Sequence, residues 1–271
     1  FCLYSKLLIT LILKYKLTLT MSIITPEGKE GKKFNVQKFY NLPNKVIHCS
    51  KCVVSNQRPR ITFDKNNVCS ACNFAEKKNN NTDWSLREKE LVDLLNRHRR
   101  KDGYWDVVVP CSGGKDSVYV AHVLKTKYGM NPLTATWAPM LYTDVGWRNL
   151  HHMIDSGIDN ILGMPDGKTH RILTKLSLEI MGDVFQPFIY GQKGFPMAVA
   201  INYKIPLVMY GENGEVEYGG DLKNADVPTH NVTDDMTKHY FSGMHPEDFE
   251  KYGIDKKKLN YYYPPKEEVA K

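Results

Sequence analysis

The sequence predicts an α/β protein built on a parallel sheet, preceded by a small ribbon that contains four cysteines. From residue 106 onward, short runs of β-branched and apolar residues alternate with helical patterns, which is typical of a parallel sheet. A glycine-rich turn joins the first of these strands directly to a helix. Two C-x-x-C pairs precede the alternating region.

Composition excludes several other classes of protein. The 271 residues are 42% hydrophobic and 25% charged, which is close to the average of globular domains and unlike disordered, collagen-like or coiled-coil chains. No apolar stretch reaches the roughly 18 residues that a membrane-spanning helix needs. The net charge of +7 suits binding of a polyanion such as a nucleotide, but is too small to indicate nucleic acid by itself.

Both ends of the sequence are unusual. Residues 1–20 are apolar with three lysines, lack a small-residue cleavage site, and precede Met21. We therefore expect translation to start at Met21, residues 1–20 to be a spurious or vestigial lead, and the protein to be cytoplasmic. The other end stops in a charged, tyrosine-rich stretch, so we expect the chain to be a fragment.

The two C-x-x-C pairs are separated by sixteen residues, a spacing typical of zinc sites. Residues 61–63 between them are predicted as a short strand and residues 64–67 as a turn. Two knuckles of this kind complete a closed tetrahedral shell, which indicates a structural rather than catalytic metal. The expected zinc ligands are Cys49, Cys52, Cys69 and Cys72.

Two other interpretations of this segment remain open. Two disulfides would need an oxidising compartment, for which nothing else in the sequence argues. A ribbon that reads nucleic acid is suggested by the basic neighbours Lys51, Arg58 and Arg60, which could equally form a solvated face.

A helix is expected to link the ribbon, residues 45–80, to the α/β domain, residues 102–225. Ser85 and Glu88 have the spacing of a capping box, and leucines follow at helical intervals. Basic residues gather where this helix, residues 83–101, would end, before Asp102 and Gly103 break it.

The strongest functional signal is the turn S-G-G-K-D-S at residues 112–117, between a predicted strand (106–111) and a helix that stops near Gly129. Glycines let the backbone approach a ligand, and the amides of a helix N-terminus bind anions. The turn is not a Walker A loop, because Lys115 is followed by aspartate and Val109 stands where the first glycine should be. Neither the serine β-lactamase motif set nor the G-x-G-x-x-G dinucleotide pattern is present.

This turn resembles the PP-loop of the ATP pyrophosphatase superfamily, whose fold is adenine nucleotide alpha-hydrolase-like. The resemblance implies cleavage of ATP at the α-phosphate, with Lys115 neutralising the departing pyrophosphate. For Asp116, placing Mg²⁺ and capping the helix remain equal alternatives. Cys111 is expected to be a core residue. The residues that would cradle pyrophosphate are Ser112, Gly113, Gly114 and Ser117.

Further strands are predicted at residues 133–137, 159–163 and 205–210, with helices from about Asp144 to 157 and over 166–182. Ligands of parallel sheets bind at the carboxyl ends of the strands. The acidic, glycine-rich turn 211–219 should therefore face the loop, where Glu212 would hold Mg²⁺ or orient an amine, with Gly211 and Asn213 in the nucleotide site; a solvated loop is the alternative.

Four residues near the predicted helices remain ambiguous. His151 and His152 are expected to pack or to face solvent. His170 and Arg171 could meet a substrate phosphate or simply begin a surface helix.

Several longer strings narrow the resemblance to one family. The chain is similar to the N-acetyl sugar amidotransferases of bacterial surface-polysaccharide and nonulosonic-acid biosynthesis over about residues 45–225. The strings are CVVSNQRPRITFD (52–64), VPC (109–111) before the glycine turn, TWAP (136–139), LYTD (141–144), QPF (186–188) and YGEN (210–213).

The resemblance implies conversion of the acetamido group of a nucleotide-activated sugar to an acetamidino group. It implies ATP, Mg²⁺ and structural Zn²⁺ as cofactors, and catalytic roles for Lys115, Asp116 and Glu212. Ammonia would come from a glutaminase partner related to the histidine-biosynthesis amidotransferase subunits. No membrane partner is expected, and nucleic acid is not the expected ligand.

The sequence departs from this family in two places. Asn67 replaces a usual glycine, although asparagine tolerates the left-handed conformation. Family members continue past this chain, so residues 226–271, with Tyr240 and Phe241, resemble the start of a further helical region. Two other functions remain open: a PP-loop enzyme that modifies tRNA, such as a thiolase, and a zinc-ribbon module that binds nucleotide without chemistry.

Overall fold

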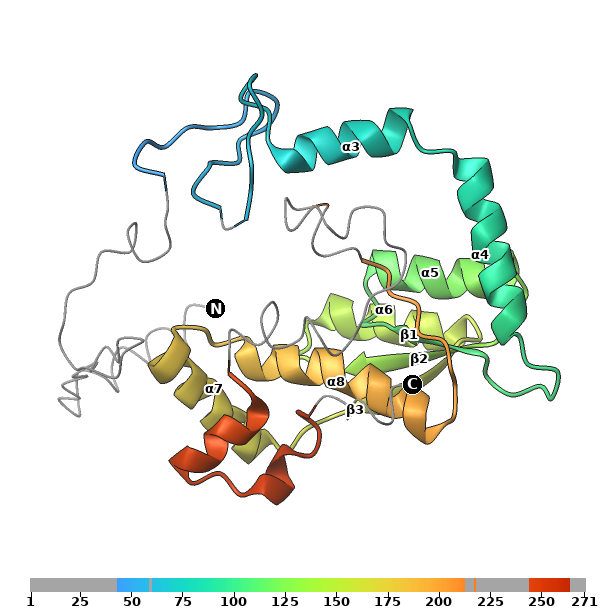
Figure 1. The fold of residues 1–271 in the computed structure, drawn as a ribbon. Coiled ribbons are helices and arrows are strands. Elements are labelled where there is room, and N and C mark those ends of the chain that lie inside the picture. The colour runs from blue at the N-terminus through green and yellow to red at the C-terminus, as the bar shows by residue number, and fades with distance from the viewer. Residues whose placement is uncertain (1–42, 59, 213–216, 218–243, 264–271) are drawn as a thin grey trace.

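A computed structural model describes residues 43–58, 60–212, 217 and 244–263 and confirms the α/β architecture with a parallel sheet (Figure 1). The strands β1 (Val107–Pro110), β2 (Pro132–Trp137) and β3 (Asp159–Gly163) lie in the order β1-β2-β3. Both pairings are parallel, so all three strands end at the same edge of the sheet. The first three predicted strands agree with the structure to within one residue at each boundary.

The predicted fourth strand forms only in part. Val208 bridges Val108 in parallel, so this segment lies beside β1 on the side away from β2. The amide of Val108 donates to Leu207 O and the amide of Met209 donates to Val108 O, both at 2.9 Å. Pro206 has no N–H to donate, which limits the ladder at this edge.

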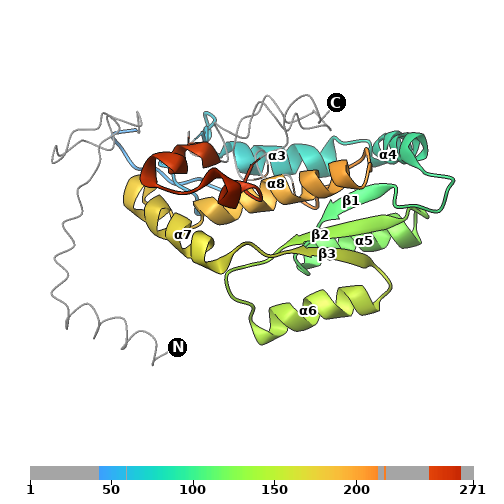
Figure 2. The same cartoon turned by 90° about the horizontal axis from the view of Figure 1, so that it is seen from below.

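Helices cover both faces of the sheet (Figure 2). The first face carries α5 (Lys115–Thr126) and α6 (Asp144–Asp155), and the second carries α7 (Gly167–Met181) and α8 (Gln186–Asn202). The helices α6 and α7 match the predicted ones, whereas α5 begins at Lys115, three residues earlier than predicted, so the second half of the predicted turn is helical. Each layer encloses an apolar core: Leu124 and Leu150 lie in the first, and Leu173 and Tyr190 in the second.

Helix α8 was not predicted, because its sequence has none of the usual helical signals. It contains Gly191, Gly194 and Pro196, and apolar residues on every side rather than along one stripe. Gly191 has a packing role, since a Cβ there would lie 2.0 Å from the Trp137 ring. Only close contact with the sheet makes this segment a stable helix.

Between residue 43 and the sheet, the structure describes the helices α3 (Ser70–Asn80), which begins at the second cysteine pair, and α4 (Trp84–His98). The linking helix is therefore confirmed, but the predicted capping box is wrong. Asp83 is the N-cap and accepts a hydrogen bond from the Leu86 amide, which places Ser85 inside the helix.

The C-terminal part of the described chain packs into the domain rather than starting a separate helical region. Two short 3-10 helices, η4 (Pro246–Tyr252) and η5 (Lys256–Leu259), cover the α7–α8 side. Phe249, Leu259 and Tyr262 are fully buried in its core. Tyr240, Phe241 and residues 1–20 lie outside the described residues. None of the described helices is long and apolar enough to cross a bilayer.

Candidate nucleotide site and four-cysteine cluster

The glycine turn after β1 has the geometry of an anion-binding loop. Gly113 has a φ of 84°, and a Cβ there would lie 2.9 Å from the Leu150 amide nitrogen, so only glycine fits. Gly114 is the N-cap of α5 and provides no side-chain cap. The first amides of a helix have no partner within it and point out from its N-terminus, where they bind anions.

The charged residues of the loop pair with each other. Lys115 Nζ lies 2.6 and 2.8 Å from the two carboxylate oxygens of Asp116, and the Lys115 side chain is 87% exposed. The suggestion that Asp116 caps the helix is wrong, because Gly114 holds that position. Ser117 Oγ donates to Gly114 O at 3.2 Å, and Ser112 is exposed at the start of the turn.

The start of the acidic turn, Gly211, lies against this loop, as its position in the sheet predicts. A Cβ on Gly211 would lie 3.0 Å from Ser117 Cα and 3.1 Å from the Asp116 carbonyl carbon, so the two backbones are in contact. Glu212 follows directly and is exposed. Asn213 lies outside the described residues.

Lys193 on α8 belongs to the same region and was missed from the sequence, because α8 itself was not predicted. Its ammonium lies 5.3 Å from the centre of the Tyr210 ring. Burial lowers the pKa of Lys193, and the nearby Glu212 carboxylate acts in the opposite direction.

A shallow groove of about 530 Å³ opens beside the loop between α5 and α6. Gly113 and Lys115 line it at the loop end, and Tyr119, His122 and His152 line it further along. The neighbouring His151 packs its ring against Trp147 at 4.5 Å, in keeping with the expected packing role.

The two remaining candidates have different environments. His170 is buried, and its Nδ1 lies 2.9 Å from the hydroxyl of Tyr262, so neither a phosphate ligand nor a surface position describes it. Arg171 is exposed on α7. Cys111 is 4% exposed beside Met153, and burial raises the pKa of its thiol, in agreement with a core role.

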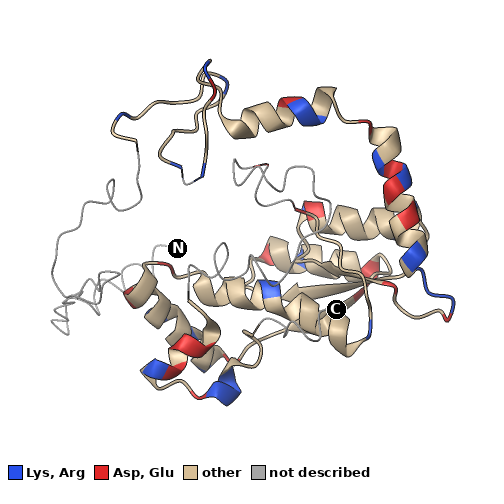
Figure 3. Cartoon of the chain, in the orientation of Figure 1, with Lys and Arg blue, Asp and Glu red and all other residues tan. Residues whose placement is uncertain are grey.

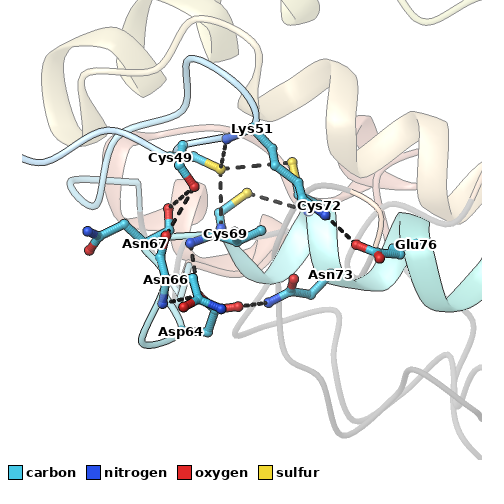
Figure 4. Close-up of polar contacts among 11 residues, drawn as sticks. Cys49, Lys51, Asp64, Asn66, Asn67, Cys69, Cys72, Asn73 and Glu76 are labelled. Atoms are coloured by element: carbon cyan, nitrogen blue, oxygen red, sulfur yellow. Dashed lines mark hydrogen bonds and ion pairs between the residues drawn. The ribbon is translucent and has the colours of Figure 1, made fainter.

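The four predicted ligands come together in one cluster (Figure 4). Cys49 Sγ lies 3.9 Å from Cys72 Sγ, and Cys52 Sγ lies 3.8 Å from Cys69 Sγ. A tetrahedral zinc with Zn–S bonds of about 2.3 Å would separate its sulfurs by roughly 3.8 Å. These residues therefore fit a zinc ion, and all of them are free thiols rather than disulfides.

Backbone amides around the cluster donate hydrogen bonds to the sulfur of Cys49, in the first cysteine pair. The amides of Cys69 and Lys51 donate to Cys49 Sγ at 3.2 and 3.4 Å. Burial alone would raise the pKa of Cys49, but these hydrogen bonds outweigh it and lower the pKa to about 6. Burial raises the pKa of Cys72 to about 12, which bound metal would have to offset.

The turn between the pairs forms as predicted, whereas residues 61–63 contribute only one bridge, from Phe63 to Cys69. Asp64 accepts the amides of Asn66 and Val68 through Oδ1 at 2.8 and 3.0 Å, which closes the turn. Asn67 adopts a φ of 57°, the left-handed conformation that asparagine tolerates.

Comparisons with known proteins give only distant similarities. No family model matches the chain. Over 88 residues it is 31% identical to an uncharacterized protein of Methanocaldococcus jannaschii, a match that covers 32% of this chain and 31% of that protein. The chain thus matches about a third of that relative's length.

Among solved structures, NMN synthetase from Francisella tularensis aligns with a TM-score of 0.34 and 12% identity, over 64% of this chain and 89% of that chain. Neither similarity assigns a family or an activity, so the chemistry has to be inferred from the site residues.

Proposed function

We propose that this chain is an ATP-dependent, AMP-forming ligase that activates the acetamido group of a nucleotide-activated sugar for attack by ammonia. The loop between β1 and α5 is the observation that carries the proposal. Its glycine-restricted backbone and the α5 N-terminus favour pyrophosphate binding, and Lys115 and Ser117 lie at the same place. The sugar specificity rests on the family resemblance of the strings described above.

The proposed reaction has two steps, adenylation of the acetamido oxygen and displacement of AMP by ammonia. The acetamido oxygen attacks the α-phosphorus of ATP, the bond to pyrophosphate breaks, and an O-adenylyl imidate forms. Ammonia then adds to the imidate carbon, and AMP leaves with the former amide oxygen, which yields an acetamidino group. The amides of the loop and Lys115 would stabilise the negative charge that develops on pyrophosphate.

Carboxylates and thiolates of this chain would hold the metals. Asp116 and Glu212, on the two turns in contact, would hold the Mg²⁺ that accompanies ATP. Zinc in the four-cysteine cluster would supply folding free energy to a segment with little apolar core.

Ammonia would come from a glutaminase partner. Outside the four-cysteine cluster, Cys111 is the cysteine that the structure describes, and it is buried with a raised pKa. A glutaminase nucleophile needs an accessible thiolate. We therefore expect ammonium salts, but not glutamine, to support the reaction of the purified chain.

The test uses ATP labelled at the α-phosphate, Mg²⁺ and ammonium, with either a pool of nucleotide-linked acetamido sugars or bulk tRNA. AMP released only with sugars is the expected result. AMP released only with tRNA would replace this proposal with a tRNA-modifying enzyme. ADP as product would mean that the loop does not direct cleavage at the α-phosphate.

A Lys115→Ala variant separates chemistry from binding alone. An adenylating enzyme should lose AMP release by orders of magnitude with this change. A non-catalytic nucleotide-binding module would show no AMP release in either form.

A further inference from the structure

Helix α8 carries one charged residue among its 17, and that residue is Lys193. Figure 3 shows α8 as an otherwise uncharged helix, in contrast to α4, which carries charges of both signs along its length. Lys193 is partly buried and is the one charged residue in a helix whose other residues are uncharged. What it could bind depends on the part of the molecule that its ammonium faces.

The position of Lys193 links it to the glycine loop. Its ammonium lies 5.3 Å from the ring of Tyr210, the residue that precedes Gly211. Gly211 in turn contacts the backbone of Asp116 and Ser117 at the start of α5. Tyr210 and Gly211 thus connect Lys193 to the start of α5, although α8 and α5 lie on opposite faces of the sheet (Figure 2).

We propose that Lys193 is a phosphate-contacting residue of the nucleotide site, so that the phosphates are bound between the α5 N-terminus and α8. This inference rests on the proposed role of the glycine loop as a nucleotide site. It adds a second cation to that site, supplied by a different helix from the one that carries Lys115.

The energetics of the site support this role. Burial disfavours the charged form of Lys193 and lowers its pKa, and Glu212 offsets this effect only in part. A phosphate oxygen would favour the charged form further, and a partly desolvated ammonium interacts with an anion more strongly than an exposed one. Lys115, by contrast, is almost fully exposed and paired with Asp116.

A purely structural role is the competing explanation, in which Lys193 holds the acidic turn in place through its contact with the Tyr210 ring. The two roles differ in which ligands they affect. Loss of a phosphate contact weakens binding of pyrophosphate and ATP but not of adenosine. Displacement of the turn would weaken all three.

The experiment measures dissociation constants of MgATP, inorganic pyrophosphate and adenosine by calorimetry on the full chain. The variants are Lys193→Met, Lys193→Gln and Lys193→Arg, with Lys115→Met as reference. The matched control is Lys175→Met, a 75% exposed lysine on α7. Thermal unfolding verifies that each variant folds, and Lys193→Gln replaces the methionine variant if that one does not.

We expect Lys193→Met to raise the dissociation constants of MgATP and pyrophosphate by about 10- to 100-fold, as for loss of a hydrogen bond to a charged group. Adenosine affinity and the Lys175→Met variant should be unchanged, and Lys193→Arg should restore most of the loss. If Lys193→Met binds pyrophosphate as tightly as the unaltered chain while Lys115→Met binds it more weakly, this inference is overturned and the proposed function stands.

If Lys193→Met loses as much affinity for adenosine as for pyrophosphate, the inference is overturned in favour of the structural role. If the unaltered chain binds neither MgATP nor pyrophosphate, the proposed function fails, and this inference fails with it.

Discussion

At the scale of single residues, two glycines determine how closely the site is assembled. Gly113 lets the backbone turn between β1 and α5 while α6 packs directly on it, and Gly211 lets the acidic turn contact the same loop. Both close approaches involve backbone atoms, which cannot move aside as a flexible side chain can. The loop is therefore held from two sides before any ligand binds.

Gly113→Ala should both destabilise the protein and weaken nucleotide binding. The left-handed backbone costs roughly 1–2 kcal/mol for alanine, and the contact with Leu150 adds a clash that the backbone must relieve. Gly182→Ala is the control, because its φ is 72° but nothing lies within 4 Å of the added Cβ. Denaturant unfolding of the two variants should show a larger loss for Gly113→Ala; equal losses would mean that the packing against α6 is unimportant.

His170 should make stability depend on pH. Burial lowers its pKa in the folded protein, whereas in the unfolded chain the pKa of histidine is about 6.5. The unfolded state then binds more protons below that pH, so the free energy of unfolding should fall as pH drops from about 7 to 5. The hydrogen bond with Thr169 is the main cause of the lowered pKa of Asp166. Protonation of this carboxylate therefore lowers the free energy of unfolding only below about pH 4.

The comparison is with His170→Asn, which removes the titrating ring. Denaturant unfolding at several pH values should show a shallower slope between pH 5 and 7 for this variant than for the unaltered protein. Identical slopes in the two proteins would exclude His170 as the group responsible.

At the scale of elements, α4 shows how a local signal can point to the wrong residue. Asp83 and Ser85 are both good N-cap residues, and Glu88 stands at the spacing that favours Ser85. The helix nevertheless begins at Trp84, and Asp83 accepts the Leu86 amide at 3.0 Å. Both residue types can cap a helix, and Asp83 does so because it directly precedes the first helical residue.

Replacing the cap tests this assignment. Asp83→Ala should lower the free energy of unfolding by about 1 kcal/mol, because one amide of the first turn loses its partner. Ser85→Ala, inside the helix, should be neutral or slightly stabilising, since alanine has the higher helix propensity. The opposite ranking in denaturant unfolding would restore the predicted capping box.

The four-cysteine element should depend on bound metal. We expect one zinc per chain by mass spectrometry of the metal content, and loss of that zinc in Cys69→Ala, because the site needs four thiolates. Cys111→Ala, in the core of the α/β domain, should keep the zinc. A Cys69→Ala protein that retains a full complement of zinc would refute the site.

At the scale of the whole molecule, the C-terminal segment is part of the domain core. Phe249 packs its ring 6.2 Å from that of Tyr190 on α8. Tyr262 packs against Trp137 at the end of β2, with ring centres 5.8 Å apart. The chain thus returns, after the sheet, to cover the helices that lie on its second face.

Phe249→Ala should therefore lower the free energy of unfolding by about 3–5 kcal/mol, as for other buried aromatic residues. Tyr252→Ala on the same short helix is the control, since its side chain is 44% exposed, and it should cost about 0.5 kcal/mol or less. Similar small effects for both would mean that this segment is not part of the cooperative unit.

Much of the fold could be predicted because its signals are local. The runs Val107–Pro110 and Pro132–Trp137 are short, apolar and bounded by turn residues, and the helices between strands have regular periodicity. Helix α8 and the core role of Tyr262 could not be predicted in this way. The glycines and prolines of α8 disfavour a helix locally, and only contact with Trp137 and β3 reverses that preference.

By itself, the sequence determined the parallel α/β class, the glycine loop between β1 and α5, and the four cysteines that could bind zinc. These features depend on residue type and short spacing, which local geometry converts into structure. Only the tertiary structure decided that Gly211 contacts the loop, that Lys193 lies beside the Tyr210 ring, and that residues 244–263 contribute to the core. Those contacts join residues far apart along the chain, and packing alone brings them together.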